Sequence, residues 1–151
     1  MSRPVRSRVR VVVGGLALLA LSLTSACLQS TGLQPSLIQL QGSWKYAGVQ
    51  TTPVRETLSG TLAILSESGT SFQGRVDLVA LNQAGQSRVI GGLVSGAEQG
   101  TNVVDFDASV EVTPRRHVGE IVADTIAGTW IGSAPDGTTS SGTFRLEKVT
   151  R

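Results

Sequence analysis

The stretch 102–112, NVVDFDASVEV, decides the fold because apolar and polar side chains alternate along it. Its even positions are apolar from Val104 to Val112, and the odd positions between them carry Asp, Ser or Glu. The stretch 71–81, SFQGRVDLVAL, has the same period of two, with Gln73, Arg75 and Asp77 on its polar side. This period is typical of strands in an antiparallel sheet that has one buried and one wet face.

Similar short runs continue from residue 42 to the end of the chain, and no helical periodicity is sustained. The segments between them are rich in Gly, Pro, Asn and Ser, which mark turns. We predict an all-β domain, an eight-stranded antiparallel up-and-down barrel, because closure leaves no open edge. A two-sheet β-sandwich has the same local pattern and is the alternative. The predicted strands span 43–49, 58–65, 71–81, 87–94, 102–112, 117–123, 125–131 and 140–149.

A short pattern, Gly-x-large, recurs four times and supports repeated strand starts. Glycine permits the tight bend that barrel closure requires. The large residue two places after each glycine is predicted to enter the core: Trp44, Leu62, Trp130 and Phe144.

The N-terminal residues 1–26 have the pattern of an export signal. Four arginines precede an apolar run from Val11 to Leu23. A run of this length is short of the roughly 20 residues of a transmembrane helix but matches the apolar region of a signal peptide.

The sequence Leu23-Thr24-Ser25-Ala26-Cys27 follows, and it holds the only cysteine of the chain. It resembles the lipobox of bacterial lipoproteins, with Thr24 at the place where the usual pattern has Leu. The resemblance implies cleavage before Cys27, diacylglycerol and acyl groups such as palmitate on Cys27, and an anchor in the cell envelope. Leu28 stands where an Asp retains many such proteins in the inner membrane, which implies the outer membrane, facing the periplasm.

Removal of residues 1–26 changes the formal net charge from +2 to −2, because four of the 13 basic residues lie in the leader. The predicted organisation is therefore a signal peptide (1–26), a lipidated tether (27–41) and a barrel domain (42–151). Leu40 and its neighbours either remain in the tether or dock on the domain. The mature chain has no basic excess for nucleic acid.

The tripeptide Gly42-Ser43-Trp44 at the first strand resembles the G-x-W of the calycin families, the lipocalins and avidin-like barrels. In those families the Trp closes one end of the barrel, and an arginine of the last strand packs across it. The resemblance implies that Trp44 and Arg145 form such a pair. No ligand-binding residue can be carried over from it.

The chain shows no recognisable catalytic motif, and we expect no enzymatic activity, cofactor or metal site. His117, the only histidine, follows Arg115 and Arg116 at a predicted turn, so we expect it on the surface. Carboxylates near residues 105–124 suggest a cation site, but a solvated face paired with arginines explains them better.

Two functions remain open. One is a small apolar ligand held inside the barrel, where Gly74, Ala80, Ala108 and Gly128 leave room and four large residues fill it: Phe72, Phe106, Trp130 and Phe144. The other is a structural or protein-interaction lipoprotein with a filled barrel. Its signature is a set of exposed apolar side chains, for which the candidates are Tyr46, Val79, Leu81 and Ile131.

Overall fold

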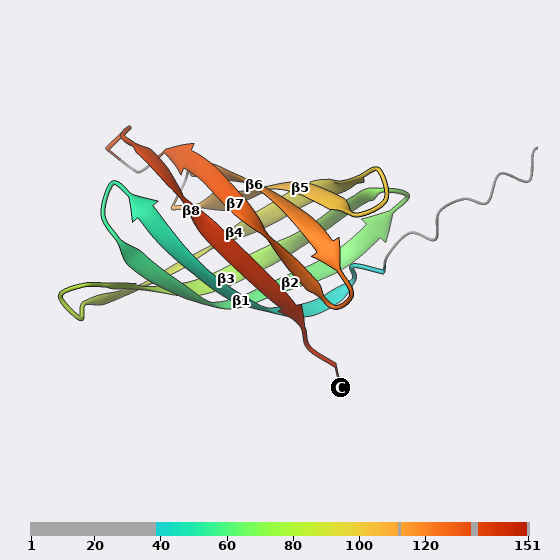
Figure 1. Cartoon of the computed structure of the whole chain (residues 1–151), viewed down its shortest axis with the longest axis horizontal. Coiled ribbons are helices and arrows are strands. Elements are labelled where there is room, and N and C mark those ends of the chain that lie inside the picture. The colour runs from blue at the N-terminus through green and yellow to red at the C-terminus, as the bar shows by residue number, and fades with distance from the viewer. Residues whose placement is uncertain (1–38, 112, 134–135, 151) are drawn as a thin grey trace, which may run out of the picture. The chain divides into compact units, whose positions relative to one another are not determined.

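The computed structural model describes residues 39–111, 113–133 and 136–150. These residues form one closed barrel of eight antiparallel strands in sequence order (Figure 1). The prediction of a barrel is confirmed, and the sandwich alternative is not. The strands are β1 (Gly42–Thr52), β2 (Glu56–Ser68), β3 (Ser71–Asn82), β4 (Ser87–Gln99), β5 (Val103–Val110), β6 (Thr113–Val122), β7 (Thr125–Ser133) and β8 (Thr139–Lys148).

Pairing of the first and last strands closes the barrel. The β1–β8 ladder runs from Trp44 opposite Lys148 to Thr52 opposite Ser141, with an irregularity between Gln50 and Thr52. Every strand therefore has two neighbours, and no row of backbone N–H and C=O groups is left unpaired along an edge. In the described part of the chain, no helix has the length and apolar character that a membrane crossing requires.

The inward face of every strand carries the core. Buried and exposed residues alternate along β3 and β6, as the period of two requires. The four large residues that follow the repeated glycines are all buried, as predicted: Trp44, Leu62, Trp130 and Phe144.

The two ends of the barrel are closed differently. At the end where β1 begins, which we call the tether end, Leu40 is buried and its carbonyl accepts a hydrogen bond from Trp44 Nε1 at 2.8 Å. Leu40 therefore docks on the domain, whereas its neighbours Leu37 and Ile38 lie outside the described residues. The opposite end, where β1, β3, β5 and β7 finish, we call the mouth.

One predicted turn is wrong. Thr113-Pro114 was expected to separate two strands, but β6 already begins at Thr113, and Pro114 lies opposite Ser109 of β5. The missing N–H of proline is tolerated at a strand start. The turn instead includes Glu111, whose backbone is left-handed with φ 51°.

Close strand contacts require glycine at several positions, and Gly92 is the tightest of them. A Cβ at Gly92 would lie 1.9 Å from the carbonyl oxygen of Ser109 on β5, whereas a Cβ at Gly91 would first meet the Asp77 side chain at 3.1 Å. We expect Gly92→Ala to lower the free energy of unfolding by about 2 kcal/mol or more. The adjacent Gly91→Ala should change it by about 0.5 kcal/mol or less. Chemical denaturation of both variants tests this, and equal effects would contradict the predicted contact.

Candidate functional site

Polar side chains occupy part of the barrel interior. Four are buried: Gln50, Arg115, His117 and Ser140. Arg115 and His117 share the inward face of β6 because alternate residues of a strand point the same way. They are the most unusual interior residues, since charged and titratable groups are rarely fully buried without partners.

His117 lies among aromatic rings. Its ring stacks on Phe106 with centroids 4.5 Å apart and meets Phe144 edge to face at 5.0 Å. Tyr46 of β1 reaches it from across the barrel, with its hydroxyl 3.3 Å from His117 Nε2. The imidazole therefore packs among the aromatic rings of the core, and each of its two nitrogens has a polar partner.

Hydrogen bonding defines the tautomer of His117. Nδ1 lies 2.8 Å from the carbonyl oxygen of Arg115, which can only accept, so Nδ1 carries the proton. Nε2 is then the acceptor for the Tyr46 hydroxyl. Burial lowers the pKa of His117 to about 4, and the charge of Arg115 acts in the same direction. Burial also raises the pKa of Tyr46, so both rings are neutral near pH 7.

The expectation of a surface histidine is therefore wrong, as His117 is only 3% exposed. The error came from the misplaced turn at Thr113-Pro114. Had β6 been extended backwards from Ile121 in steps of two, the same phase would have placed His117 and Arg115 inside. Tyr46 is also buried and not an exposed apolar residue as expected, because it faces inward two places after Trp44.

Arg115 lies just above His117, toward the mouth. Its guanidinium lies 4.8 Å from the centre of the Trp130 ring, a cation–π contact. Its one charged partner among the described residues is Glu111, with Nη2 3.2 Å from Oε2. Burial lowers the pKa of Arg115, and the nearby charge of Arg88 lowers it further.

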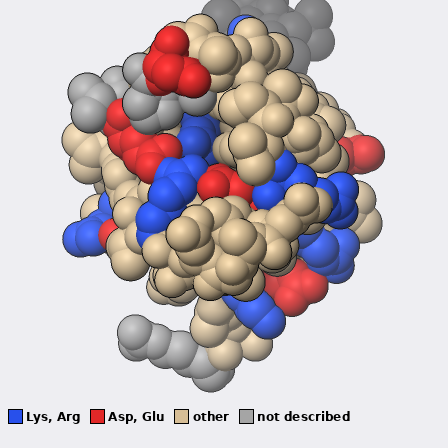
Figure 2. Space-filling view, turned by 90° about the vertical axis from the view of Figure 1, so that its left-hand side faces the viewer, with Lys and Arg blue, Asp and Glu red and all other residues tan. Residues whose placement is uncertain are grey.

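Ion pairs close the mouth. Arg88 of β4 bonds Glu56 at 2.6 Å and also contacts Glu111, which in turn contacts Arg115. Figure 2 views this end and shows acidic and basic side chains side by side near its centre. The network holds two arginines and two glutamates, so it carries no net charge and covers the mouth with ion pairs.

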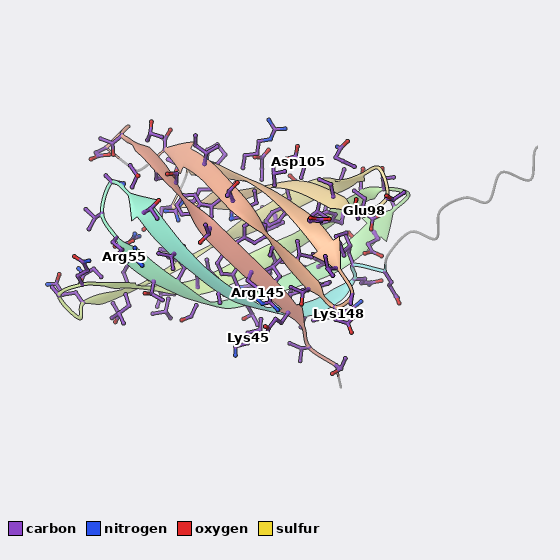
Figure 3. All side chains as sticks on the ribbon, in the orientation of Figure 1. Lys45, Arg55, Glu98, Asp105, Arg145 and Lys148 are labelled. Carbon is purple, nitrogen blue, oxygen red and sulfur yellow. The ribbon has the colours of Figure 1, made fainter. Side chains whose placement is uncertain are left out.

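The predicted pair of Trp44 and Arg145 does not form. Trp44 points into the barrel, whereas Arg145 is exposed on the outer face of β8 and pairs with Glu147 at 3.0 Å (Figure 3). The cation near the Trp44 ring is Lys148, whose Nζ lies 5.4 Å from the ring centre and also donates to the Gln39 carbonyl. The register explains this, because Lys148 and not Arg145 lies opposite Trp44.

The cavity found inside the barrel is small. The cavity between Tyr46, Phe106 and His117 measures about 10 Å³, which is room for about one water molecule. The small residues that were expected to leave room are offset by large neighbours, since Phe72, Phe106, Trp130 and Phe144 are all buried.

Two of the carboxylates considered for a cation site are engaged in ion pairs elsewhere. Asp105 pairs with Arg116 at 2.5 Å on the outer surface, and Glu111 belongs to the mouth network. Within residues 39–111, 113–133 and 136–150, His, Cys, Asp and Glu form no group of metal-ligating geometry. Cys27 lies outside the described residues.

The barrel is similar in fold to several solved structures. EF1p2_mFAP2b bound to DFHBI is 13% identical, with TM-score 0.60, over 73% of this chain and 94% of that one. A de novo designed fluorescence-activating β-barrel is 14% identical, with TM-score 0.53, over 76% of this chain and 98% of that one. A protein of unknown function from Bacteroides ovatus is 10% identical, with TM-score 0.53, over 74% of this chain and 42% of that one. No protein-family model and no curated protein matches the sequence.

The buried imidazole predicts a pH-dependent stability. His117 is held neutral in the folded state, with a pKa of about 4, whereas in the unfolded chain it protonates below about pH 6.5. Stability is therefore complete above pH 6.5, falls as the pH drops below it, and is lower by about 3 kcal/mol once the pH is under 4.

Chemical denaturation between pH 8 and pH 4 measures this loss. His117→Gln is the matched variant because Gln keeps a donor and an acceptor but does not titrate. The difference in unfolding free energy between the two proteins should shrink toward low pH. A constant difference would show that His117 is not held neutral.

Proposed function

We propose that the protein is an exported, lipid-anchored and non-catalytic barrel of the bacterial cell envelope that acts through its outer surface on another envelope protein. The observation that carries this is the filled interior. Its cavity of about 10 Å³ is far below the roughly 300–1,000 Å³ of small-molecule sites. Of the two functions that the sequence left open, the structural or interaction lipoprotein therefore has the better support.

An apolar surface on two neighbouring strands supports a protein contact. Val79 of β3 lies directly opposite Val89 of β4, and Leu81 and Leu93 lie on the same outer face. Val89 is 82% exposed and Leu93 is 75% exposed. We call these four residues the β3–β4 apolar face. Exposed apolar groups that gather on one surface are typical of interaction sites.

Two charged residues lie within this face, because Arg75 is opposite Leu93 and Asp77 stands between Arg75 and Val79. Arg75 and Asp77, on the same outer side of β3, form a two-bond pair with each other. The barrel has no free strand edge, so a partner must bind side chains and cannot add a strand. The mature charge of −2 gives no support to a nucleic-acid partner.

The lipid anchor at Cys27 rests on the lipobox. Two or more acyl chains give stable membrane attachment, whereas one chain gives only marginal attachment. Position 28 is Leu and not Asp, which favours the outer membrane with the barrel in the periplasm.

A small ligand inside the barrel is the second candidate. EF1p2_mFAP2b, a structure of similar fold, holds DFHBI, and the interior here contains polar groups that an apolar core does not need. The space that remains excludes a lipid-sized apolar molecule, so such a ligand must be small.

Loss of the anchor should change where the protein is found. We expect Cys27→Ser to move the protein from the envelope membrane fraction to the soluble fraction. The substitution should also abolish labelling of the protein by radioactive palmitate. Ser25→Ala, a nearby change that keeps a small residue, is the control and should behave like the wild type. Persistent labelling of Cys27→Ser would contradict lipidation at Cys27.

Site-specific crosslinking tests the contact role in intact cells. A photo-crosslinking residue at Val89 should give one discrete product of higher mass. The same residue at Thr61, which is outward-facing and exposed on β2, should give none.

Native mass spectrometry of the protein purified from the same envelope should then show the polypeptide with its Cys27 lipids and no apolar small molecule. Absence of a Val89 product, together with a stoichiometric adduct that solvent extraction releases, would overturn the contact role in favour of the second candidate.

A further inference from the structure

Three buried hydrogen-bond donors near the mouth have no partner among the described residues. They are Arg115 Nε, Trp130 Nε1 and Ser140 Oγ. The three residues are 3%, 2% and 0% exposed. We call them the donor corner. A buried polar group without a partner costs about 1–3 kcal/mol, so each such group calls for an explanation.

The three donors come from adjacent strands. Arg115 of β6 lies opposite Gly132 of β7, and Gly132 lies opposite Ser140 of β8. Trp130 is two places before Gly132 on the same inward face of β7 and lies opposite Gly142 of β8. The donor corner thus occupies one patch of the inner wall, next to the strand ends that form the mouth.

Two glycines shape this patch. A Cβ at Gly132 would come within 2.9 Å of Arg115 Cγ, and a Cβ at Gly142 within 2.9 Å of Trp130 Cε2. The absence of side chains lets the arginine stem and the indole ring lie flat against β7 and β8. It also means that neither position can supply an acceptor for the donors.

Arg115 has fewer carboxylate contacts than Arg88 has. Both carboxylates of the mouth, Glu56 and Glu111, bind Arg88 closely. Arg115 keeps only the second oxygen of Glu111, at 3.2 Å. Arg115, Trp130 and Ser140 therefore offer more hydrogen-bond donors than the surrounding described residues offer acceptors.

We propose that the donor corner binds the carboxylate group of a small organic acid that enters through the mouth and replaces Glu111 on Arg115. A carboxylate has two oxygens and accepts up to four hydrogen bonds, which suits a guanidinium, an indole N–H and a hydroxyl. The remainder of the acid stays in the mouth, since the core below is filled. This inference does not depend on the β3–β4 apolar face, and it gives the second candidate function a site and a ligand class.

The residues that must move are free to do so. The side chain of Arg88 is 40% exposed and that of Glu111 is 23% exposed. Both can turn toward water when a ligand carboxylate takes over Arg115, and the exchange of one carboxylate for another keeps the local charge favourable. Glu111 is thus a built-in competitor of the ligand.

The indole N–H groups of the two tryptophans provide the test. Trp44 Nε1 is bonded to the Leu40 carbonyl and serves as an internal reference, whereas Trp130 Nε1 is free to donate to a new partner. The ¹⁵N-labelled mature chain, residues 27–151 with Cys27→Ser, is titrated with acetate and, separately, with acetamide of nearly the same shape. Acetate should move the Trp130 indole signal saturably and leave the Trp44 signal unchanged, and acetamide should move neither.

Variants separate binding from a general salt effect. Glu111→Gln should tighten acetate binding several-fold because it removes the competitor, an outcome that mere loss of structure would not produce. Ser140→Ala should weaken binding about tenfold. Arg115→Lys should weaken it strongly, whereas Arg116→Lys, the outward neighbour paired with Asp105, should leave it unchanged.

An unmoved Trp130 signal at saturating salt, equal movement of both indoles, or weaker binding by Glu111→Gln would each overturn the proposal. The Val89 crosslink would be unaffected by any of these results, so failure of the donor corner and failure of the contact role are distinguishable.

Discussion

Closure of the sheet between β1 and β8 is the constraint on which the rest of the structure depends. Once eight strands close, the inner wall has a fixed circumference, and the interior is just wide enough for the side chains of the wall itself. Each strand then sends alternate residues into the same limited space. Five buried Trp and Phe side chains, the aliphatic core residues and the Tyr46–His117 pair occupy it, and the cavity beside Tyr46 and His117 measures about 10 Å³. The size of the interior thus follows from strand number and from the bulk of a few inward positions.

The same closure explains why polar groups gather at one end. Apolar side chains fill the middle, and Leu40 with Trp44 seals the tether end. The mouth has no such apolar cover, and it is closed by Arg88, Glu56 and Glu111. Arg115 lies between the two regions, stacked on Trp130 but short of acceptors. A buried ion pair contributes little net stability when its geometry is imperfect, so the contact of Arg115 with Glu111 offsets little of the cost of burying the guanidinium.

Local sequence pattern predicted the eight strands and most inward positions, because alternation is a property of each strand alone. It could not predict what depends on pairing between strands. Arg145 and Lys148 both follow the last glycine pattern, and only the register with Trp44 decides which cation reaches the ring. The repeated glycines were expected at strand starts, but Gly60 and Gly128 lie within β2 and β7, where their missing side chains admit the neighbouring backbone. His117 was misplaced because proline was read as a turn when it stands near a strand start.

The two ends of the barrel also differ in the groups that they offer for contact with other molecules. Leu40 and Trp44 cover the tether end, and Lys148 lies beside the Trp44 ring there. The mouth, together with the β3–β4 hairpin that carries Val79, Leu81 and Val89, lies at the opposite end. The proposed protein contact and the proposed acid site therefore share one end of the barrel. Arg88, the second residue of β4, is the chain neighbour of Val89, and a ligand that displaces Glu111 from Arg115 changes the bonds that hold Arg88 in place.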